Sequence, residues 1–248
     1  MSARKSRVAT VGVWLAVLSL VVLVLSILGN RMELVHFGIA VRGMAIAALV
    51  GVAAALLSAV GLVLTLVTSR RGARMAMAGL VISLLVAAPV VQAMLVGAKV
   101  PRIHDITTDI DNPPAFKAAL PVRGEGANPL DRTEPADLAE QQRAAYPDIV
   151  TLELNQHPGK VFEAALRAAK ASGWEIISAD PASGMIEAVA TTPVMAFKDD
   201  VAIRITEMET GTAVDMRSVS RVGMSDLGAN ANRIRSYFHT LKNHLADM

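Results

Sequence analysis

Three long apolar runs, separated by short polar segments, fill the first hundred residues. The runs cover residues 8–28, 43–68 and 75–97, and none has a charged side chain in its interior. Each exceeds the roughly 18 apolar residues that are needed to cross a bilayer. Only a helix satisfies its own backbone hydrogen bonds in lipid. We therefore predict three transmembrane helices, so that residues 1–98 form an anchor whose partner is the lipid bilayer.

Small residues recur at spacings of three and four in the second run, at Gly51, Ala55, Ser58 and Gly61. Such spacing lets helix backbones approach closely. We interpret the stripe as packing inside a three-helix bundle, with a dimerisation face as the alternative. A proton or ion path usually needs an ionisable group in the membrane, and the three runs contain no such Asp, Glu, Lys or Arg. We therefore do not expect a transporter.

Basic residues are concentrated before the first run and between the second and third. Cytoplasmic loops carry an excess of Lys and Arg, so both places are predicted to be cytoplasmic. Three spans then put the C-terminal domain outside the cytoplasm. This predicts a multi-pass protein of the plasma (inner) membrane, with a periplasmic domain where the cell has two membranes. The basic residues are Arg4, Lys5, Arg7, Arg70, Arg71 and Arg74.

The charge balance changes sign after residue 98. Residues 1–98 carry eight Lys/Arg and one Glu, a net +7, whereas residues 99–248 carry sixteen Lys/Arg and twenty-one Asp/Glu, a net −5. Nucleic-acid binding needs a basic face against phosphate, so we expect no nucleic-acid partner. The chain has no cysteine, which excludes disulfides, thiol nucleophiles and cysteine-ligated zinc.

The remainder of the chain is predicted to be a linker and arm, residues 99–147, followed by an α+β domain, residues 148–248. The linker is rich in Pro, Asp and Gly, which interrupt regular elements. Beyond it, period-two patterns predict strands and one-sided apolar stripes predict helices, in the order β-α-β-β-β-β-α. This order implies an antiparallel sheet with helices on one face. The predicted strands are 149–154, 174–179, 185–191, 201–207 and 212–222, and the helices are 158–172 and 229–245.

The last two strands are predicted to form a hairpin with a tight loop centred on Thr210 and Gly211. The register follows from that loop. It places Val201 and Ile203 on one face of the sheet and the charged side chains on the other. A slip by one residue would move charges into the apolar face, so the hydrophobic pattern supports these faces.

On the charged face, the predicted register sets Asp200 opposite Arg221 and Arg204 opposite Arg217. Like charges directly opposed destabilise a sheet, so we expect a carboxylate or a bound anion between the last two. An internal salt-bridge network that holds the hairpin to loop 225–233 is the favoured interpretation. A site where guanidinium groups bind an anion is the alternative. The candidate ligand-binding residues are Arg204, Arg217, Arg221, Asp199, Asp200, Asp215, Asp226 and Asn230.

Other chemistry has weaker support in the sequence. His104, Asp105 and Asp109 could suggest a metal site, but in a Pro-rich segment we expect them to be solvated or capping groups. There is no phosphate-binding loop, dinucleotide fingerprint, zinc-protease pattern or serine nucleophile elbow. We therefore name no catalytic residue, metal or cofactor.

Three separated motifs resemble the domain-of-unknown-function 1499 family. The similarity extends over roughly residues 100–242. The family has no established activity, so the resemblance implies a common domain and no particular chemistry. The motifs are RIHDITTD (102–109) with NPPAF (112–116), FKDDVAIR (197–204), and VDMRSVSRVG (214–223) with SDLG (225–228) and NANRI (230–234).

From these observations we expect a non-enzymatic protein of the cell envelope. Its extracytoplasmic domain would bind a partner protein or a small anionic or lipidic ligand. The alternative is an enzyme that acts at the membrane surface through the arginine–aspartate cluster. An enzyme needs a concave site with convergent functional groups, so the shape of the domain surface should separate the two.

Overall fold

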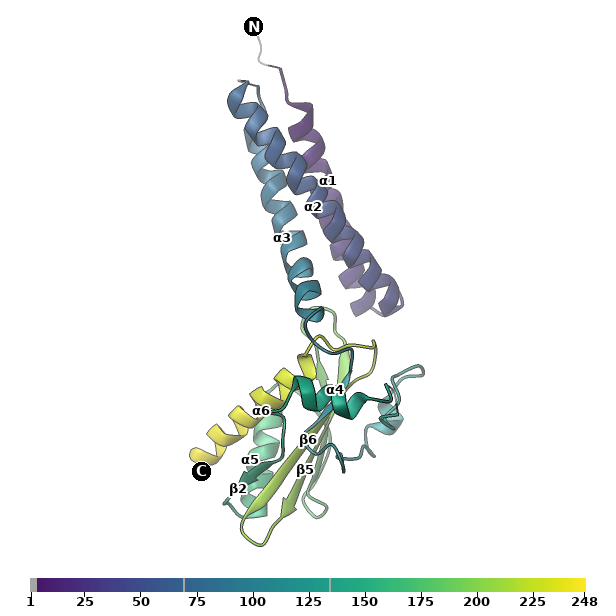
Figure 1. Cartoon of the computed structure of the whole chain (residues 1–248), viewed down its shortest axis with the longest axis vertical. Coiled ribbons are helices and arrows are strands. Elements are labelled where there is room, and N and C mark those ends of the chain that lie inside the picture. Colours follow the sequence, from purple (N-terminus) through teal and green to yellow (C-terminus); the bar gives the residue numbers. More distant parts are fainter. Residues whose placement is uncertain (1–3, 69, 134) are drawn as a thin grey trace. The chain divides into compact units, whose positions relative to one another are not determined.

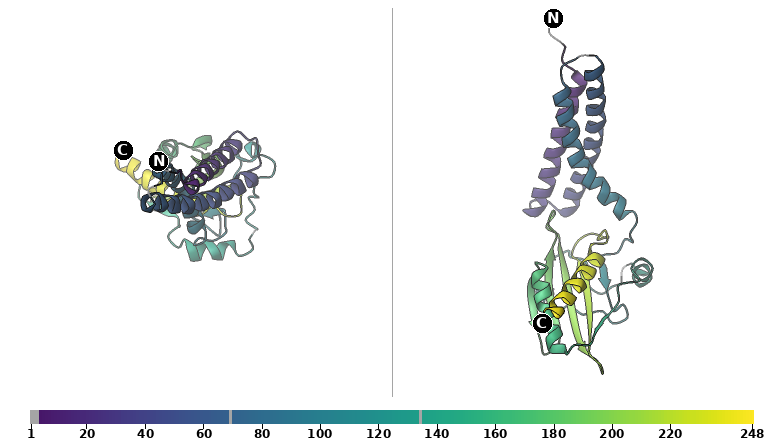
Figure 2. Two further views of the ribbon diagram at one scale, coloured as in Figure 1. Left: turned by 90° about the horizontal axis from the view of Figure 1, so that it is seen from above. Right: turned by 90° about the vertical axis from the view of Figure 1, so that its left-hand side faces the viewer.

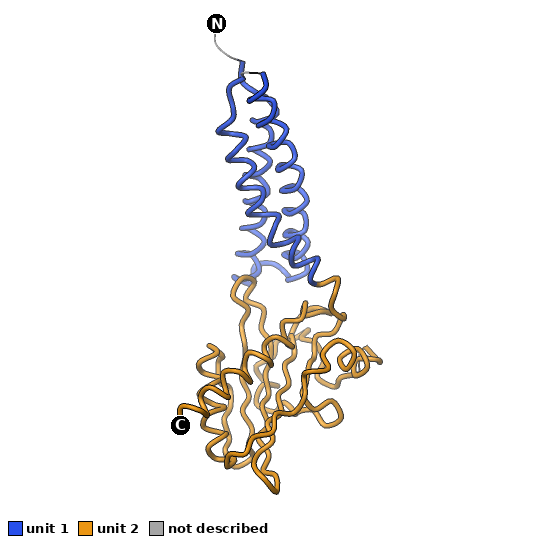
Figure 3. The backbone as a smooth tube through the Cα atoms, turned by 60° about the vertical axis from the view of Figure 1, so that its left-hand side comes forward, with its two compact units in different colours: residues 1–96 blue, residues 97–248 orange. Residues whose placement is uncertain are grey.

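The computed structural model describes residues 4–68, 70–133 and 135–248. The chain forms two compact units, Met1–Val96 and Gly97–Met248 (Figure 3). The first unit consists of long helices, and the second contains a sheet with shorter helices (Figure 1).

The helices of the first unit are α1 (Arg7–Arg31), α2 (Phe37–Val67) and α3 (Ala73–Gly97). All three are long and apolar enough to cross a membrane, as predicted. Helix α2 starts six residues before its predicted start because a cap determines where it begins. The ring nitrogen Nδ1 of His36 accepts the backbone N–H of Gly38 at 3.1 Å, and this bond satisfies one of the unpaired amides at the helix start.

Small residues bring the helices of the first unit together. Gly51, Ser58 and Gly61 of α2 are all buried. A Cβ atom added to Gly61 would lie 2.8 Å from the backbone nitrogen of Ala9 in α1, so only glycine fits at this crossing. The side chain of Ser58 faces Gly12 of α1 in the same way. Three residues of the predicted stripe therefore serve packing within the bundle, whereas the fourth, Ala55, is only partly buried.

The second unit has the predicted α+β class. Its sheet has the strand order β1-β6-β5-β4-β3, and β2 pairs with β6 as well. All pairings are antiparallel. The two short strands β1 and β2 thus share one edge of β6. The strands are β1 (Asp105–Thr107), β2 (Leu152–Leu154), β3 (Glu175–Asp180), β4 (Met185–Thr191), β5 (Lys198–Glu207) and β6 (Thr212–Ser220), and the helices are α4 (Leu138–Ala145), α5 (Pro158–Ala171), α6 (Ala229–Ala246) and the 3-10 turn Leu120–Val122.

Helices α5 and α6 lie across one face of the sheet and form the main core with it (Figure 2). Alternate residues of β5, among them Val201 and Ile203, point into this core and are fully buried. Tyr237 of α6 is also fully buried and donates its hydroxyl hydrogen to the carbonyl of Ala165 in α5 at 3.0 Å. This bond satisfies the buried hydroxyl group and ties the two helices together.

Part of the segment 99–147, which belongs to the same compact unit, packs on the opposite face of the sheet. We call this segment the arm. It contains β1, the 3-10 turn and α4. Its Phe116 and Ala119 pack on Ala202 of β5 and Val219 of β6, forming a second and much smaller apolar cluster. Other apolar side chains of the arm, namely Ile103, Ile106, Leu138 and Tyr146, belong to the main core. On the opposite face of the sheet the apolar cluster is small, so polar contacts must supply much of the attachment there.

The hairpin of β5 and β6 has the predicted faces but not the predicted register. Arg204 faces Asp215, and Arg217 faces Ala202. The predicted pairing of Arg204 with Arg217 is therefore wrong by two residues. The loop has four residues, 208–211, because it is closed by a hydrogen bond from the Met208 N–H to the Gly211 carbonyl at 3.0 Å. A shift by two residues leaves every side chain on its original face.

This architecture predicts that the arm is needed for folding. Fragment 99–248 should be soluble and melt in one cooperative transition, because about 150 residues is ample for a single core. Fragment 148–248 lacks the arm and would expose the charged face of the sheet, so it should fail to melt cooperatively. The measurement is thermal melting of both fragments by circular dichroism. Cooperative melting of the shorter fragment would show that the arm is dispensable.

Candidate functional site

Four aspartates in the strands of the sheet are buried and paired with arginines. Asp105, Asp199, Asp200 and Asp215 are each at most 4% exposed. Each of them forms an ion pair with at least one arginine. A buried carboxylate without a partner would be strongly destabilising. The pairing therefore decides whether this face of the domain is stable.

Arg217 of β6 joins the sheet to the arm. It donates to both carboxylate oxygens of Asp105, at 3.1 Å from Nε and 2.7 Å from the terminal nitrogen. It also donates to the carbonyl of Leu130 at 2.6 Å, and its guanidinium lies over the ring of Phe116 at 5.2 Å. Arg132 of the arm contacts Asp105 from the other side. This network leaves Arg217 only 4% exposed.

Asp200 of β5 has no exposed surface and holds two arginines. Arg221 donates to it at 2.7 Å and 3.1 Å, and Arg123 of the arm contacts its other oxygen. The predicted ion pair of Asp200 with Arg221 is thus present. It is a diagonal contact, because the residue directly opposite Asp200 is Val219.

Glu187 of β4 binds the arm through backbone amides. Its two carboxylate oxygens accept the N–H groups of Lys117, Ala118 and Ala119 at 2.9 to 3.1 Å. Successive amides that converge on one carboxylate form an anion-binding nest. The sequence contains a signal for this contact, because a glutamate interrupts the mostly apolar strand MIEAVAT.

Asn230 and Asp199 fix the start of α6 to the sheet. Asn230 is fully buried, accepts the Ser218 hydroxyl at 2.8 Å and donates to the His104 carbonyl at 2.9 Å. Asp199 pairs with Arg233. Burial raises the pKa of the Asp199 carboxyl, and the charge of Arg233 opposes that rise.

Asp226 caps helix α6. Its carboxylate accepts the backbone N–H groups of Gly228 and Asn230 at 2.8 and 2.9 Å. Burial raises its pKa, and these two hydrogen bonds act in the opposite direction. The Asp226 carboxylate therefore satisfies backbone amides at the start of α6, as acidic residues do at helix starts.

Arg204 lies between two carboxylates. It donates to Asp215 at 2.7 Å and to Asp109 at 2.8 Å. We expected one anion or carboxylate to be shared by Arg204 and Arg217. Instead, among the described ion pairs, each arginine has its own carboxylate partners, because the true register places Asp215 opposite Arg204.

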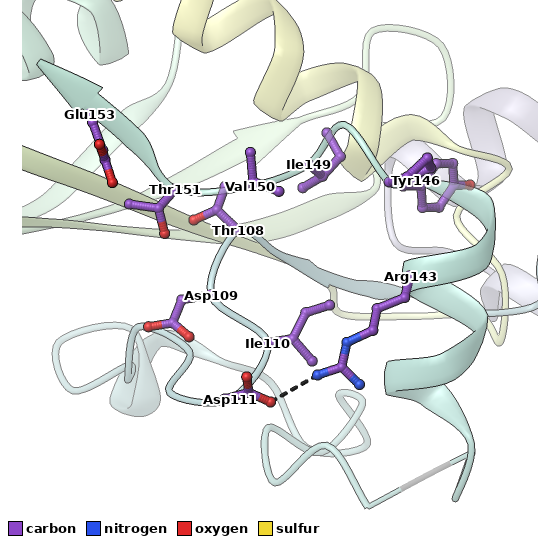
Figure 4. A pocket seen from close by; sticks show the side chains of 11 residues that line it. Thr108, Asp109, Ile110, Asp111, Arg143, Tyr146, Ile149, Val150, Thr151 and Glu153 are labelled. Carbon is purple, nitrogen blue, oxygen red and sulfur yellow. Dashed lines mark hydrogen bonds and ion pairs between the residues drawn. The ribbon is translucent and has the colours of Figure 1, made fainter.

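Asp215 also marks the point where β1 and β2 meet on the edge of β6. The hydroxyls of Thr108, just after β1, and Thr151, just before β2, both donate to the same oxygen of Asp215, at 3.0 and 2.6 Å. A groove of about 600 Å³ opens at this junction (Figure 4), and we call it the junction groove. Its lining residues are Thr108, Asp109, Ile110, Asp111, Arg143, Tyr146, Pro147, Ile149, Val150, Thr151 and Glu153.

The junction groove combines apolar and acidic groups. Segments 108–111 and 146–153 line two of its sides (Figure 4). Val150 is 58% exposed there. Asp111 and Arg143 form an exposed ion pair across the groove at 2.8 Å. For Glu153, no ion pair is found among the described residues. The groove thus offers hydrogen-bond acceptors, one cation and exposed aliphatic surface.

The comparison with known families matches residues 105–241 to the model described as Protein of unknown function (DUF1499). The match covers more than half of the chain and includes all six strands of the second unit, α4, α5 and most of α6. The chain belongs to the DUF1499 family. No curated protein matches it. The DUF1499 motifs recognised in the sequence supply most of the buried ion pairs described above, including both partners of Arg217–Asp105 and Asp200–Arg221.

The eight predicted site residues do not form one cluster. They separate into Asp200 with Arg221, Arg204 with Asp215, the group around the start of α6, and Arg217 with an arm carboxylate. Asp105 was expected to be solvated or capping, and this is wrong, since it is 1% exposed. Residues that the sequence reasoning missed are Asp105, Arg123, Arg132, Glu187, Thr108 and Thr151.

Replacing Arg217 by methionine should strongly destabilise fragment 99–248. The substitution leaves Asp105 buried beside a single arginine, and breaking a buried pair costs roughly 3–5 kcal/mol. The measurement is the free energy of unfolding in urea, with and without phosphate at matched ionic strength. Phosphate should not raise the free energy of unfolding of the wild type, because the arginines already have carboxylate partners.

The matched control is Arg235→Met. Arg235 also pairs with an aspartate, Asp148, but the two side chains are 40% and 53% exposed. An exposed pair is worth about 1 kcal/mol or less. Equal losses of unfolding free energy in the two variants would show that the buried Arg217–Asp105 pair contributes no more than an exposed pair. Stabilisation of the wild type by phosphate, absent from Arg217→Met, would favour an anion site.

Proposed function

We propose that the protein is a non-enzymatic, membrane-anchored binding protein, and that the junction groove of its extracytoplasmic domain receives a segment of a partner protein. The observation that carries the proposal is the groove itself, at the meeting point of β1 and β2 above Asp215. Ligand sites in proteins are usually concave and measure about 300–1,000 Å³. The junction groove, at about 600 Å³, is within this range.

The arginine–aspartate cluster supports a structural role better than an anion site or a catalytic one. Arg217 and Arg221 are less than 10% exposed, and their charges are already balanced by Asp105 and Asp200. Arg204 is more accessible, but two carboxylates occupy its terminal nitrogen. An incoming anion would have to displace these partners. The cluster makes the groove floor rigid and so prepares the groove for binding.

The composition of the groove favours a partner segment with a basic side chain. Asp109, Asp111 and Glu153 line it, against Arg143 as the single basic lining residue. Residues 99–248 as a whole carry a net charge of −5. Complementary charge speeds encounter and selects the partner. Ile110 and Val150 provide apolar surface for a neighbouring side chain of the same segment.

The orientation proposed from the basic residues can be tested with a fusion. A phosphatase that is active only outside the cytoplasm, fused after Met248, should be active, because the positively charged segments before α1 and between α2 and α3 favour the cytoplasmic side. The measurement is phosphatase activity in intact cells. Activity of a cytoplasm-only reporter at the same position would refute the extracytoplasmic location of the domain.

The groove is tested by photocrosslinking in the native membrane. A photoreactive amino acid at Val150 of the full-length protein should give an adduct of defined mass, whereas one at Lys170, on the exposed side of α5, should not. The double substitution Asp111→Lys and Glu153→Lys should abolish the adduct, because it reverses the charge of the groove. The variant loses the exposed ion pair between Asp111 and Arg143. Such a pair is worth about 1 kcal/mol or less, so the fold should survive.

The matched control for charge is Glu163→Lys with Glu175→Lys. Both glutamates are exposed and lie outside the groove, so this variant has the same net charge as the groove variant. It should retain the adduct. No adduct from Val150, or one that survives reversal of the groove charges, would contradict the proposal. Equal loss in both double variants would show a general charge effect instead of recognition by the groove.

A further inference from the structure

We propose that the end of the helical unit where α1 and α3 begin binds the phosphate of an anionic phospholipid headgroup. A pocket of about 420 Å³ lies there, lined by four basic residues, Lys5, Arg70, Arg71 and Arg74. We call it the basic pocket. It is formed only by residues of the first unit, and the inference is independent of the junction groove.

Backbone hydrogen bonds hold the walls of the basic pocket together. The segment before α1 runs beside the turn between α2 and α3. The N–H of Ser6 donates to the Arg71 carbonyl at 2.9 Å, and the N–H of Arg71 donates to the Arg4 carbonyl at 3.2 Å. Lys5 and Arg71 are consequently bridged by main-chain contacts. The backbones of two basic residues from distant parts of the sequence are thus held next to each other.

The positive charges of the basic pocket are not balanced by the protein. All four side chains are exposed, and no ion pair involves them among the described residues. Glu33, the one acidic residue in residues 1–98, lies beyond the other end of α1. Helices α1 and α3 both start here, and helix N-termini add partial positive charge. An anion in the pocket would relieve the repulsion among these groups.

The surroundings of the basic pocket favour a lipid as the source of this anion. The three helices that meet there are apolar enough to cross a membrane, so their ends lie at the level of the headgroups. Met75, partly exposed, lines the pocket beside the arginines. The pocket therefore offers arginine forks for a phosphate and apolar surface for the adjoining chain. Basic pockets at the ends of membrane helices bind anionic headgroups in this way.

Native mass spectrometry of the full-length protein in detergent tests the proposal. The protein is titrated with dioleoylphosphatidylglycerol or with dioleoylphosphatidylcholine. We expect the first bound phosphatidylglycerol to have a dissociation constant about tenfold lower than that of phosphatidylcholine, which corresponds to about 1.4 kcal/mol. Equal affinity for the two lipids would overturn the proposal.

Two variants of equal charge localise the binding. Arg70→Gln with Arg71→Gln should abolish the preference for phosphatidylglycerol. Arg4→Gln with Arg7→Gln removes the same charge from the same end of the unit but from outside the pocket lining, and it should keep the preference. Equal loss in both would show general surface attraction and overturn the site. If the first variant does not fold, the single substitution Arg74→Gln must still reduce the preference.

A competition distinguishes a lipid from a soluble anion. Inorganic phosphate, added at the concentration of phosphatidylglycerol and at matched ionic strength, should not displace the lipid, because it lacks the apolar chains that pack beside Met75. Displacement by inorganic phosphate would assign the pocket to a soluble anion and overturn the lipid proposal.

Discussion

The α+β unit depends on pairing buried carboxylates of the sheet with arginines that are distant in the sequence. The helix face of the sheet is held by an apolar core, but the opposite face has only a small apolar cluster around Phe116 and Ala202. On that face the arm is attached mainly by ion pairs, while its Ile103, Ile106, Leu138 and Tyr146 pack into the main core. Arg217 reaches Asp105, and Asp200 reaches Arg123. Each pair is costly to desolvate and strongly destabilising when broken. The arm and the sheet must therefore assemble together, which explains why one compact unit includes both.

This dependence explains what could be predicted from the sequence. The apolar helices and the alternating strands follow from local periodicity. The two faces of the β5–β6 hairpin follow from the same pattern, and they are correct even though the register is displaced by two residues. The partners of the charges do not follow from it. The Asp105–Arg217 and Asp200–Arg123 pairs are long-range contacts between the arm and the sheet, and no spacing rule links them. The junction groove was missed for the same reason, since it arises only when Thr108 and Thr151 meet at Asp215.

The family resemblance is explained by the same interactions. The motifs that identify the DUF1499 family contain Asp105, Asp200, Arg217 and Arg221, which pair inside the domain. A motif with these residues reports the way the arm is bound to the sheet. It does not by itself report a ligand. Charged motif residues are often interpreted as a site, and here that interpretation would confuse a structural network with a binding surface.

The two units of the chain treat charge in opposite ways, and this contrast indicates where ligands should be sought. In the α+β unit, internal carboxylates neutralise the buried arginines, and the junction groove is an accessible surface lined by more acidic than basic residues. In the helical unit, Lys5, Arg70, Arg71 and Arg74 surround a pocket without a carboxylate partner among the described residues. Since an unbalanced cluster of like charges is stabilised by a counter-ion, the first surface suits a basic partner and the second an anionic lipid. The unpaired charge belongs to the basic pocket and, in the junction groove, to Glu153, since Asp109 and Asp111 already pair with Arg204 and Arg143 in the part of the chain that the structure describes.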